Sequence, residues 1–332
     1  MKRFGVVKMI TLDSISLLIP LEAIIAKNFY GDVIERERGG NIVESIEYKV
    51  VEGIEGLKYI EFNRLNGTMK IQLSAKLLER DYYRLISIET IELLFYKINY
   101  YGLVKLNTTK AIETALLLNC DFTKNLKVDK VSSYIFDIYR ASERISKDWF
   151  VKLYKKNTSI EFEQKRKRNR IRAIMYDKHK EMMKEMKRMQ KKGIEYNLGV
   201  EKFKNVLRFE VNTKTLQNIR ELAGLEDKED TLLLKVLKSK ENPNLKVFEK
   251  IFHRIGDYLN IDNIRKEDIR KFFEMKGVVS ELKSIQNYFN LLLEKGYSQA
   301  SAYRIVNELR QIASNERTNK RIKEIYELLK VA

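Results

Sequence analysis

The hydrophobic pattern of the chain changes character near residue 225. Before this point, short apolar runs with period-two alternation recur, and residues 206–211 are an example. Such runs are typical of strands in an antiparallel sheet. After Gly224 they disappear, and apolar residues recur at the three- and four-residue spacing of amphipathic helices. The pattern therefore predicts an α+β region, residues 1–225, built around an antiparallel sheet, and an all-helical region, residues 226–332.

Turn and capping signals divide these regions into elements. Asn66-Gly67 is a hairpin signal, Pro20 ends the first strand, and Gly193 ends a charged helix. Residues 131–144 fit either a helix or a pair of strands. The expected strands cover residues 9–19, 46–51, 57–63, 68–73, 116–122, 159–162, 171–176 and 206–211. The expected helices cover residues 86–99, 178–192, 230–239, 245–258, 266–275, 279–294, 299–313 and 317–330.

The charge of the chain favours a polyanionic partner. Lysine and arginine outnumber aspartate and glutamate by 64 to 46, for a net charge of +18. A field of this sign attracts nucleic acid first and anionic membrane second. No apolar run approaches the ~20 residues that span a bilayer. Asp13 interrupts the first apolar stretch, so we expect no signal peptide and no membrane partner. We expect a cytoplasmic location.

Cysteine and histidine usage limits the kinds of metal site. Cys120 is the single cysteine, which excludes an intramolecular disulfide and a cysteine-based zinc cluster and fits a reducing compartment. The two histidines, His179 and His253, lie far apart in the sequence. Any metal must therefore be held mainly by carboxylates, which favours hard ions such as Mg²⁺ or Mn²⁺.

Tyr176 lies at the end of an expected strand, and Lys178 follows two residues later. A tyrosine hydroxyl can attack a phosphodiester and hold the broken strand as a phosphotyrosine. The neutral phenol is a weak nucleophile, so a nearby cation must favour the phenolate. In an extended strand the period of two places Lys178 on the same face as Tyr176. The alternative is that Tyr176 is an ordinary strand residue, one of 18 tyrosines in the chain.

Three carboxylates, Asp13, Asp121 and Glu210, lie within or at the end of apolar runs. Burying a carboxylate without compensation is costly. Three such residues in one sheet suggest a shared metal ion, which would gather their charge and polarise a phosphate oxygen. The alternative is that each faces the solvated side of the sheet, because alternation puts Arg208 and Glu210 together on one face.

A basic tract precedes Tyr176. It has six cations in the eight residues 165–172. Such a tract could track a phosphate backbone and deliver a DNA strand to the tyrosine, although a run of charge is also typical of a solvated loop. The candidate DNA-binding residues are Lys165, Arg166, Lys167, Arg168, Arg170 and Arg172.

Residues 280–312 resemble a helix-turn-helix. One expected helix ends at Glu294, Gly296 turns the chain, and Ser298 can cap the next helix. Tyr303 and Arg304 are among the polar residues left to face outward, where they could read a major groove. A plain helical hairpin fits the same pattern.

Taken in order, these features resemble one family. They are the leading strand with residues 10–13, the Ile71-Gln72-Leu73-Ser74 segment, and the strand ending at Asp121. They continue with Tyr176-Asp177-Lys178-x-x-Glu181, Leu207-Arg208-Phe209-Glu210 and Ser301-Ala302-Tyr303-Arg304. The order resembles the rolling-circle replication initiators of filamentous phages and related plasmids. The resemblance spans nearly the whole chain through short motifs. The His-x-His metal motif of the wider nicking-enzyme class is absent from the sequence.

The resemblance implies a metal-dependent nicking and strand-joining enzyme that acts on origin DNA, both double- and single-stranded, through a 5′-phosphotyrosine. It makes Tyr176 the nucleophile and Lys178 its activator or phosphate partner. The implied metal ligands are Asp121 and Glu210, with Glu181 as helper and Asp13 as a further candidate, and Arg208 supports Glu210 or binds phosphate. Tyr303 and Arg304 match the family's C-terminal helix start. The sequence leaves open whether the C-terminal helices bind DNA, a host helicase or a polymerase, and whether the chain forms a homodimer.

Two other functions fit the same residues less fully. A non-catalytic DNA-binding initiator or repressor would need the charge and the C-terminal helices but neither the tyrosine nor a metal. An RNA-binding protein would share the charge and would prefer structured single-stranded RNA.

Overall fold

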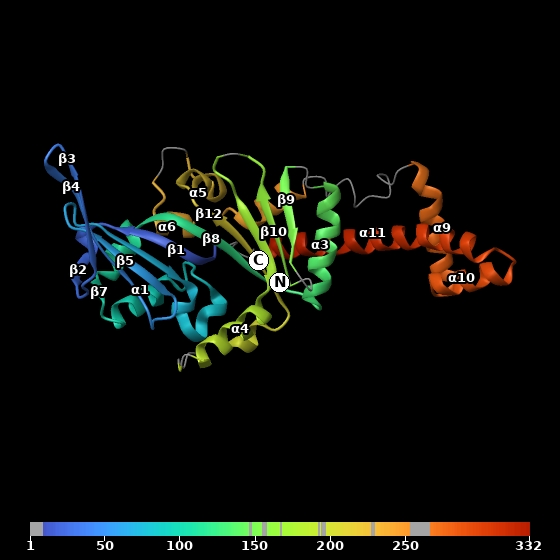
Figure 1. The fold of residues 1–332 in the computed structure, drawn as a ribbon, viewed down its shortest axis with the longest axis horizontal. Coiled ribbons are helices and arrows are strands. Elements are labelled where there is room, and N and C mark those ends of the chain that lie inside the picture. The colour runs from blue at the N-terminus through green and yellow to red at the C-terminus, as the bar shows by residue number, and fades with distance from the viewer. Residues whose placement is uncertain are drawn as a thin grey trace, which may run out of the picture.

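The computed structural model describes residues 9–145, 148–154, 158–166, 168–191, 193, 197–226, 230–252 and 266–332. Its main feature is a ten-stranded sheet in the order β3-β4-β5-β6-β1-β8-β12-β11-β10-β9, in which every neighbouring pair is antiparallel (Figure 1). The strands are β1 Leu12–Ile19, β3 Asp32–Arg38, β4 Asn41–Val50, β5 Leu57–Asn63, β6 Met69–Ser74, β8 Leu116–Lys127, β9 Trp149–Leu153, β10 Ser159–Gln164, β11 Arg172–Asp177 and β12 Val206–Thr213. A second, two-stranded sheet pairs β2 Ile24–Lys27 with β7 Val104–Leu106. The predicted α+β class is confirmed.

The large sheet consists of two halves with the same connectivity. In the first half β1 is followed by the meander β3 to β6, whose last strand returns to pair with β1. In the second half β8 is followed by the meander β9 to β12, whose last strand returns to pair with β8. Because β1 and β8 pair with each other in the middle, the run β1-β8-β12-β11 joins four segments that are distant in the sequence.

One face of the second half is the hydrophobic core. On β12 the alternate residues Leu207, Phe209 and Val211 are fully buried, and Phe209 packs edge-on against Phe248. The helices α3 Val131–Ile145, α5 Leu216–Ala223 and α7 Pro243–Ile251 pack on these strands. The other alternate residues of β12 therefore point to the opposite, polar face.

Short helices cover the end of the sheet where β6 and β11 finish. These are η2 Ala75–Arg84, α4 Lys178–Lys191 and η4 Val200–Phe203. α1 Ile91–Tyr100 packs on η2 and on α2 Thr108–Thr114, and α2 packs on η1 Leu21–Ala23, which follows β1. α4 packs on β12 and η4, and η2 packs on β1. The segment 131–144, for which the sequence left two alternatives, is the helix α3.

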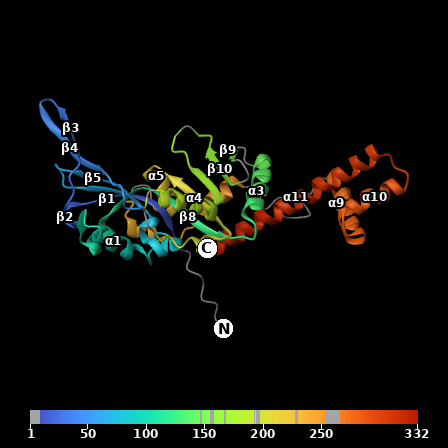
Figure 2. The ribbon, with the colours of Figure 1, turned by 60° about the horizontal axis from the view of Figure 1, so that its bottom comes forward.

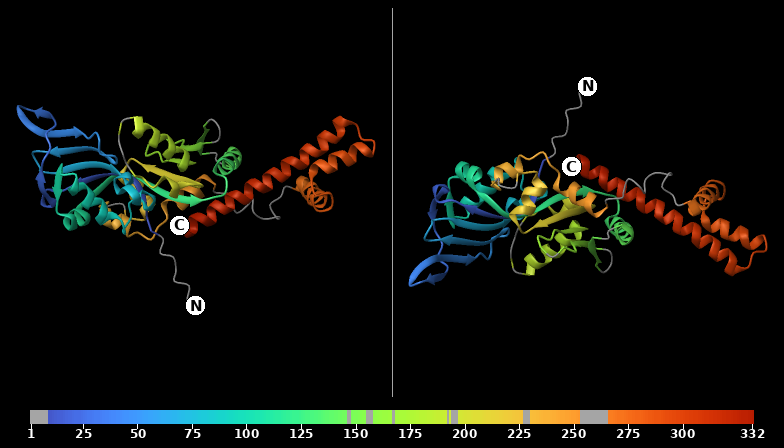
Figure 3. Two further views of the ribbon diagram at one scale, coloured as in Figure 1. Left: turned by 90° about the horizontal axis from the view of Figure 1, so that it is seen from below. Right: turned by 90° about the horizontal axis from the view of Figure 1, so that it is seen from above.

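The C-terminal helices are α9 Lys266–Leu282, α10 Ile285–Glu294 and α11 Gln299–Val331. α11 is one long helix that extends from the sheet to α9 and α10, as Figures 1 and 3 show. The sequence predicted two helices here, with a break at residues 314–316. No glycine or proline occurs at that break, so the backbone has no reason to stop, and this prediction was wrong.

The break between α9 and α10 also differs from the prediction. Gly277 lies inside α9, and the chain instead turns at Lys283, whose φ is +64°. A glycine inside a helix costs only about 1 kcal/mol, so packing can override it. Ser284 then caps α10 by accepting a hydrogen bond from the Asn287 N–H at 3.1 Å. Ser298 caps α11 in the predicted way, through the Ser301 N–H at 3.2 Å.

Packing joins part of the helical region to the sheet. Residues of α6 Leu233–Leu237 and of α7 belong to the same buried cluster as the strands, and so does Ile325 near the C-terminal end of α11. Leu292, Ala302 and Val306 form a separate small cluster at the other end of α11. The sequence predicts a boundary at residue 225 between two domains that fold independently, and this boundary remains a prediction.

Among the helices that the structure describes, none is both long enough and apolar enough to cross a bilayer.

The Cys120 thiol lies in the core on β8, 1% exposed, beside Thr213. Burial raises its pKa well above the ordinary value. We therefore expect a thiol reagent such as DTNB to react with the native protein at least about 10³-fold more slowly than with the unfolded chain, because the buried thiol must first be exposed. Stopped-flow absorbance with and without guanidinium measures the ratio. Equal rates would contradict this packing.

Candidate active site

Tyr176 and Glu210 meet on the polar face of the sheet. The register of β11 and β12 pairs Tyr176 with Arg208 and Ile174 with Glu210, so both polar side chains lie on one face. The Tyr176 hydroxyl donates a hydrogen bond to Glu210 Oε1 at 2.5 Å. The Glu210 side chain keeps only 12% of its surface exposed, so the pair is largely buried.

Lys178 lies beside Tyr176, although by a different geometry from the predicted one. β11 ends at Asp177, and Lys178 is the first residue of α4 rather than part of the strand. Asp177 Oδ1 accepts a hydrogen bond from the Lys180 N–H, which caps the helix. The helix start still places Lys178 Nζ 3.4 Å from the Tyr176 hydroxyl oxygen. The ammonium also pairs with Glu181 Oε2 at 2.6 Å.

Arg208 holds two carboxylates at this site. Its Nη1 lies 3.2 Å from Asp13 Oδ1 and 3.7 Å from Glu210 Oε1. Its Nε donates to Asn125 Oδ1 at 2.9 Å, and Nη1 donates to the Tyr82 hydroxyl at 3.0 Å. The side chain has no exposed surface. Arg208 is therefore placed to support Glu210 and Asp13 rather than to contact DNA directly.

The cluster shifts the pKa values of its members. Burial, followed by the nearby charge of Asp13, raises the pKa of Glu210 to about 7. Burial and Glu210 raise the pKa of Tyr176 well above 10, and burial and Arg208 lower the pKa of Lys178. Burial opposes ionisation of Asp13, but Arg208 and Lys178 outweigh it and lower its pKa. At neutral pH, Tyr176 is thus a phenol whose proton faces a carboxyl with a pKa suited to accept it.

Two of the predicted metal ligands, Asp121 and Glu181, have other side-chain partners. In the β8–β12 register Asp121 stands opposite Asn212, two residues along the strand from the pair of Thr123 and Glu210. Asp121 accepts a hydrogen bond from the Asn212 side chain at 2.6 Å. Burial raises its pKa to about 6. Glu181 faces Lys178 from α4. In the part of the chain that the structure describes, no three His, Cys, Asp or Glu side chains form a metal-ligand group.

The remaining pair, Asp13 and Glu210, fits a hard divalent cation. Asp13 Oδ1 is buried and accepts no hydrogen bond within the described residues, although it faces Arg208. Mg²⁺ is commonly bound by one or two protein carboxylates together with substrate phosphates and water. A pair of adjacent carboxylates is therefore enough if the substrate supplies phosphate oxygens.

The basic tract lies between β10 and β11 and is partly neutralised. Arg172 forms a two-point ion pair with Glu161 at 2.6 and 2.8 Å, and Arg170 pairs with Glu163 at 3.1 Å. Arg166 donates to Asn218 Oδ1 at 3.1 Å. Lys165 Nζ lies 5.4 Å from the centre of the Phe150 ring, Arg168 is exposed, and Lys167 lies outside the described residues.

Tyr303 and Arg304 are exposed in the first turns of α11, next to α10. They belong to the helical unit at the far end of α11 and not to the Tyr176 cluster. The α10–α11 hairpin matches the predicted helix, turn and capped helix.

Sequence reasoning missed two polar members of the cluster. Asn125 lies on β8, which continues to Lys127 and not to residue 122 as predicted. Residues 123–127 are mostly polar, so the apolar run that marked the strand ends at Phe122 and does not predict this continuation. Tyr82 lies in the irregular helix η2. The residues next to it in the sequence give no indication that its hydroxyl contacts Arg208.

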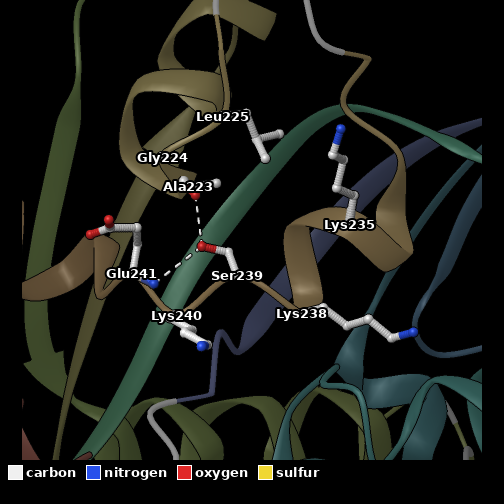
Figure 4. Close-up of a pocket in the computed structure, with 8 residues that line it drawn as sticks. All are labelled: Ala223, Gly224, Leu225, Lys235, Lys238, Ser239, Lys240 and Glu241. Carbon is white, nitrogen blue, oxygen red and sulfur yellow. Dashed lines mark hydrogen bonds between the residues drawn. The ribbon is translucent and has the colours of Figure 1, made fainter.

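A shallow hollow of about 430 Å³ occurs elsewhere, between the end of α5 and the α6–α7 connection. Figure 4 shows three lysines, Lys235, Lys238 and Lys240, around it, with Ser239 bridging Ala223 and Glu241. None of the predicted site residues lines it.

Comparisons with known proteins identify no family. No family model matches the chain, and no curated protein matches it. Among solved structures, a rolling circle replication initiator protein from Geobacillus stearothermophilus is similar over 61% of this chain and 73% of that chain, at 11% identity and a TM-score of 0.25. A TM-score this low assigns neither a fold nor a function to this chain.

Replacing Arg208 by methionine should destabilise the protein by about 3–5 kcal/mol, because the change leaves Asp13 and Glu210 buried beside each other without their shared cation. The urea midpoint measured by circular dichroism reports the loss. Arg208→Lys keeps the charge and should cost less. An unchanged midpoint for Arg208→Met would mean that the guanidinium does not hold the cluster together.

Proposed function

We propose that this protein is a rolling-circle replication initiator that nicks and rejoins one DNA strand through Tyr176. The observation that carries the proposal is the Tyr176 hydroxyl, 2.5 Å from the Glu210 carboxylate and 3.4 Å from the Lys178 ammonium. A nucleophile, a proton acceptor and a cation thus meet at one oxygen atom. The sequence motifs that resemble the initiators fall on these residues, and the net charge of +18 suits a DNA substrate.

The chemistry follows from the positions of these groups. The Tyr176 oxygen attacks the phosphorus, forming the tyrosyl–phosphate bond, while its proton passes to Glu210. The bond from phosphorus to the 3′ oxygen breaks, and the leaving oxygen takes up a proton from water as a 3′-OH. Lys178 is placed to stabilise negative charge on the tyrosine oxygen as it forms. Attack of the 3′-OH on the phosphotyrosine reverses the step and closes the strand.

Asp13 and Glu210 are the residues that would hold Mg²⁺ or Mn²⁺. Carboxylate oxygens are the ligands that these hard ions prefer. When bound, the ion would neutralise charge on the phosphate oxygens during transfer. Arg208 would keep both carboxylates oriented toward one point.

The test is a denaturing gel after incubation with labelled single-stranded oligonucleotides and supercoiled plasmid that carry the candidate origin of the protein's own replicon. We expect a protein–DNA adduct with Mn²⁺ and none with EDTA. Binding to a footprinted origin without any adduct would instead support a non-catalytic initiator or repressor. Preferred binding of structured single-stranded RNA would support an RNA-binding role.

Arg168 provides a test of the path that the DNA strand takes. If the exposed arginine contacts a phosphate, Arg168→Ala should weaken binding of unrelated sequences to a similar extent and reduce the slope of log affinity against log salt by about 0.7 for single-stranded DNA. Fluorescence anisotropy over a series of salt concentrations measures both. Lys110→Ala, on the exposed surface of α2, removes an equal charge from a distant element and serves as the control. An unchanged slope would place the strand elsewhere.

A further inference from the structure

The free edge of the large sheet at β3 carries an unusual surface. Within the described residues β3 pairs with β4 alone, and all seven of its residues are exposed. Four apolar side chains of this hairpin, Val33, Ile34, Ile42 and Val43, are between 44% and 53% exposed. Figures 1 and 2 both show β3 and β4 at the end of the molecule opposite α10. The other five residues of β3 are charged, with both signs, and the unpaired backbone groups of an exposed edge strand are a template for pairing with another strand.

The opposite edge of the sheet has the features that protect an edge. β9 has five residues, it carries the exposed Lys152, and α3 packs against it. Short edge strands, lysine and a covering helix are the usual means by which proteins prevent edge pairing. β3 is longer, and within the described residues all of its side chains stay exposed, so its edge is the one suited to a partner.

The sequence of β3 is complementary to itself when two copies run antiparallel. A twofold axis perpendicular to the sheet would relate the two copies and keep each side chain on the same face. Because side chains alternate between the two faces, an even-numbered residue can stand opposite only an even-numbered residue, and an odd-numbered one only an odd-numbered one. With Ile34 opposite Ile34 of the second copy, Asp32 stands opposite Arg36 of the second copy, and this ion pair occurs twice. The registers centred on Glu35 or on Arg36 would instead place like charges opposite each other, which is unfavourable.

The neighbouring strand continues the same arrangement of apolar and charged side chains. On β4, Ile46 stands opposite Ile34 and Glu44 stands opposite Arg36, with an Arg36–Glu44 ion pair of 2.7 Å. On this face of the sheet, Ile34 and Ile46 therefore form an apolar centre next to the proposed pairing edge, with charged residues at both ends.

We propose that the protein dimerises by antiparallel pairing of β3 with β3 of a second copy, centred on Ile34. The sheet then continues through both copies. Five strands separate β3 from β12 in the sheet order, so this pairing leaves both Tyr176 clusters uncovered. The proposal does not depend on the nicking chemistry.

Sedimentation velocity of the full chain at about 1–100 µM tests the proposal, a range that resolves micromolar self-association. We expect a concentration-dependent dimer. Asp32→Lys alone and Arg36→Glu alone each place like charges opposite one another twice, and each should weaken dimerisation roughly tenfold or more. A wild-type protein that stays monomeric throughout the range would overturn the proposal.

Mixing the two variants tests the register itself. In the mixed pair, Lys at position 32 of one copy faces Glu at position 36 of the other, and the native Arg36 faces the native Asp32. We therefore expect the mixture to form heterodimers when neither variant forms homodimers. Glu113→Lys and Lys110→Glu, on the exposed surface of α2, change the net charge equally and should leave dimerisation unchanged. Dimers in both single variants, or no heterodimer in the mixture, would reject the Ile34-centred pairing.

Discussion

Tyr176→Phe is expected to abolish the covalent protein–DNA adduct and to lower the nicking rate on the order of 10⁴-fold or more, because the ring loses the only atom that can attack phosphorus. Binding should change little. The hydroxyl donates one hydrogen bond, to Glu210, and the phenylalanine ring fills the same space. Single-turnover nicking of an origin oligonucleotide measures the rate, and anisotropy measures the affinity.

The control for Tyr176→Phe is Tyr96→Phe, which removes an exposed hydroxyl on α1. It should nick at the wild-type rate. Adduct formation by Tyr176→Phe at more than a trace level would reject Tyr176 as the nucleophile. A loss of DNA affinity equal to the loss of rate would mean that the tyrosine serves binding and not chemistry.

Glu210→Gln should be the next most severe change. The amide fills the same volume, but it cannot take the Tyr176 proton, and it is a weaker ligand for a hard cation. Removing a general base typically costs about 10²–10⁴-fold in rate. We expect a loss of this size in single-turnover nicking at saturating Mn²⁺, with DNA affinity retained.

Glu47→Gln is a matched control for Glu210→Gln, because Glu47 is also a buried glutamate, paired with Lys27 in the first half of the sheet. Any general effect of neutralising a buried carboxylate should appear in both variants. Equal rates for Glu210→Gln and wild type, across a titration of Mn²⁺, would remove Glu210 from the mechanism.

Much of this site could be predicted from sequence because it lies on regular strands. Period-two alternation located Tyr176, Arg208 and Glu210 on strands and placed the last two on one face. Alternation says nothing about which strands are neighbours. The position of Asp13 next to Arg208 depends on the pairing of β1 with β8, which joins the two halves of the sheet.

The same limit explains the outcome for Asp121. Its place at the end of an apolar run suggested a ligand beside Glu210. The register instead pairs Asp121 with Asn212, and a shift of one alternation moves a side chain by about 7 Å along the strand. Register depends on the turns and bulges of the assembled sheet, and the apolar pattern of a single strand does not contain it.

β3 was missed for a related reason. Residues 32–38 have mostly charged side chains and lack a buried face, so no hydrophobic pattern marks the strand. It forms because it continues the meander beyond β4, where Gly39 and Gly40, with φ of +63° and +81°, supply the turn.

The most direct test of the nicking mechanism is to locate the DNA on the protein. The adduct would be digested with nuclease and trypsin, and the modified peptide would be sequenced by mass spectrometry. Trypsin cuts after Arg172 and Lys178, so we predict a nucleotide on the peptide of residues 173–178, which has Tyr176 as its single tyrosine. A nucleotide on any other tyrosine, including the neighbouring Tyr82, would contradict the mechanism.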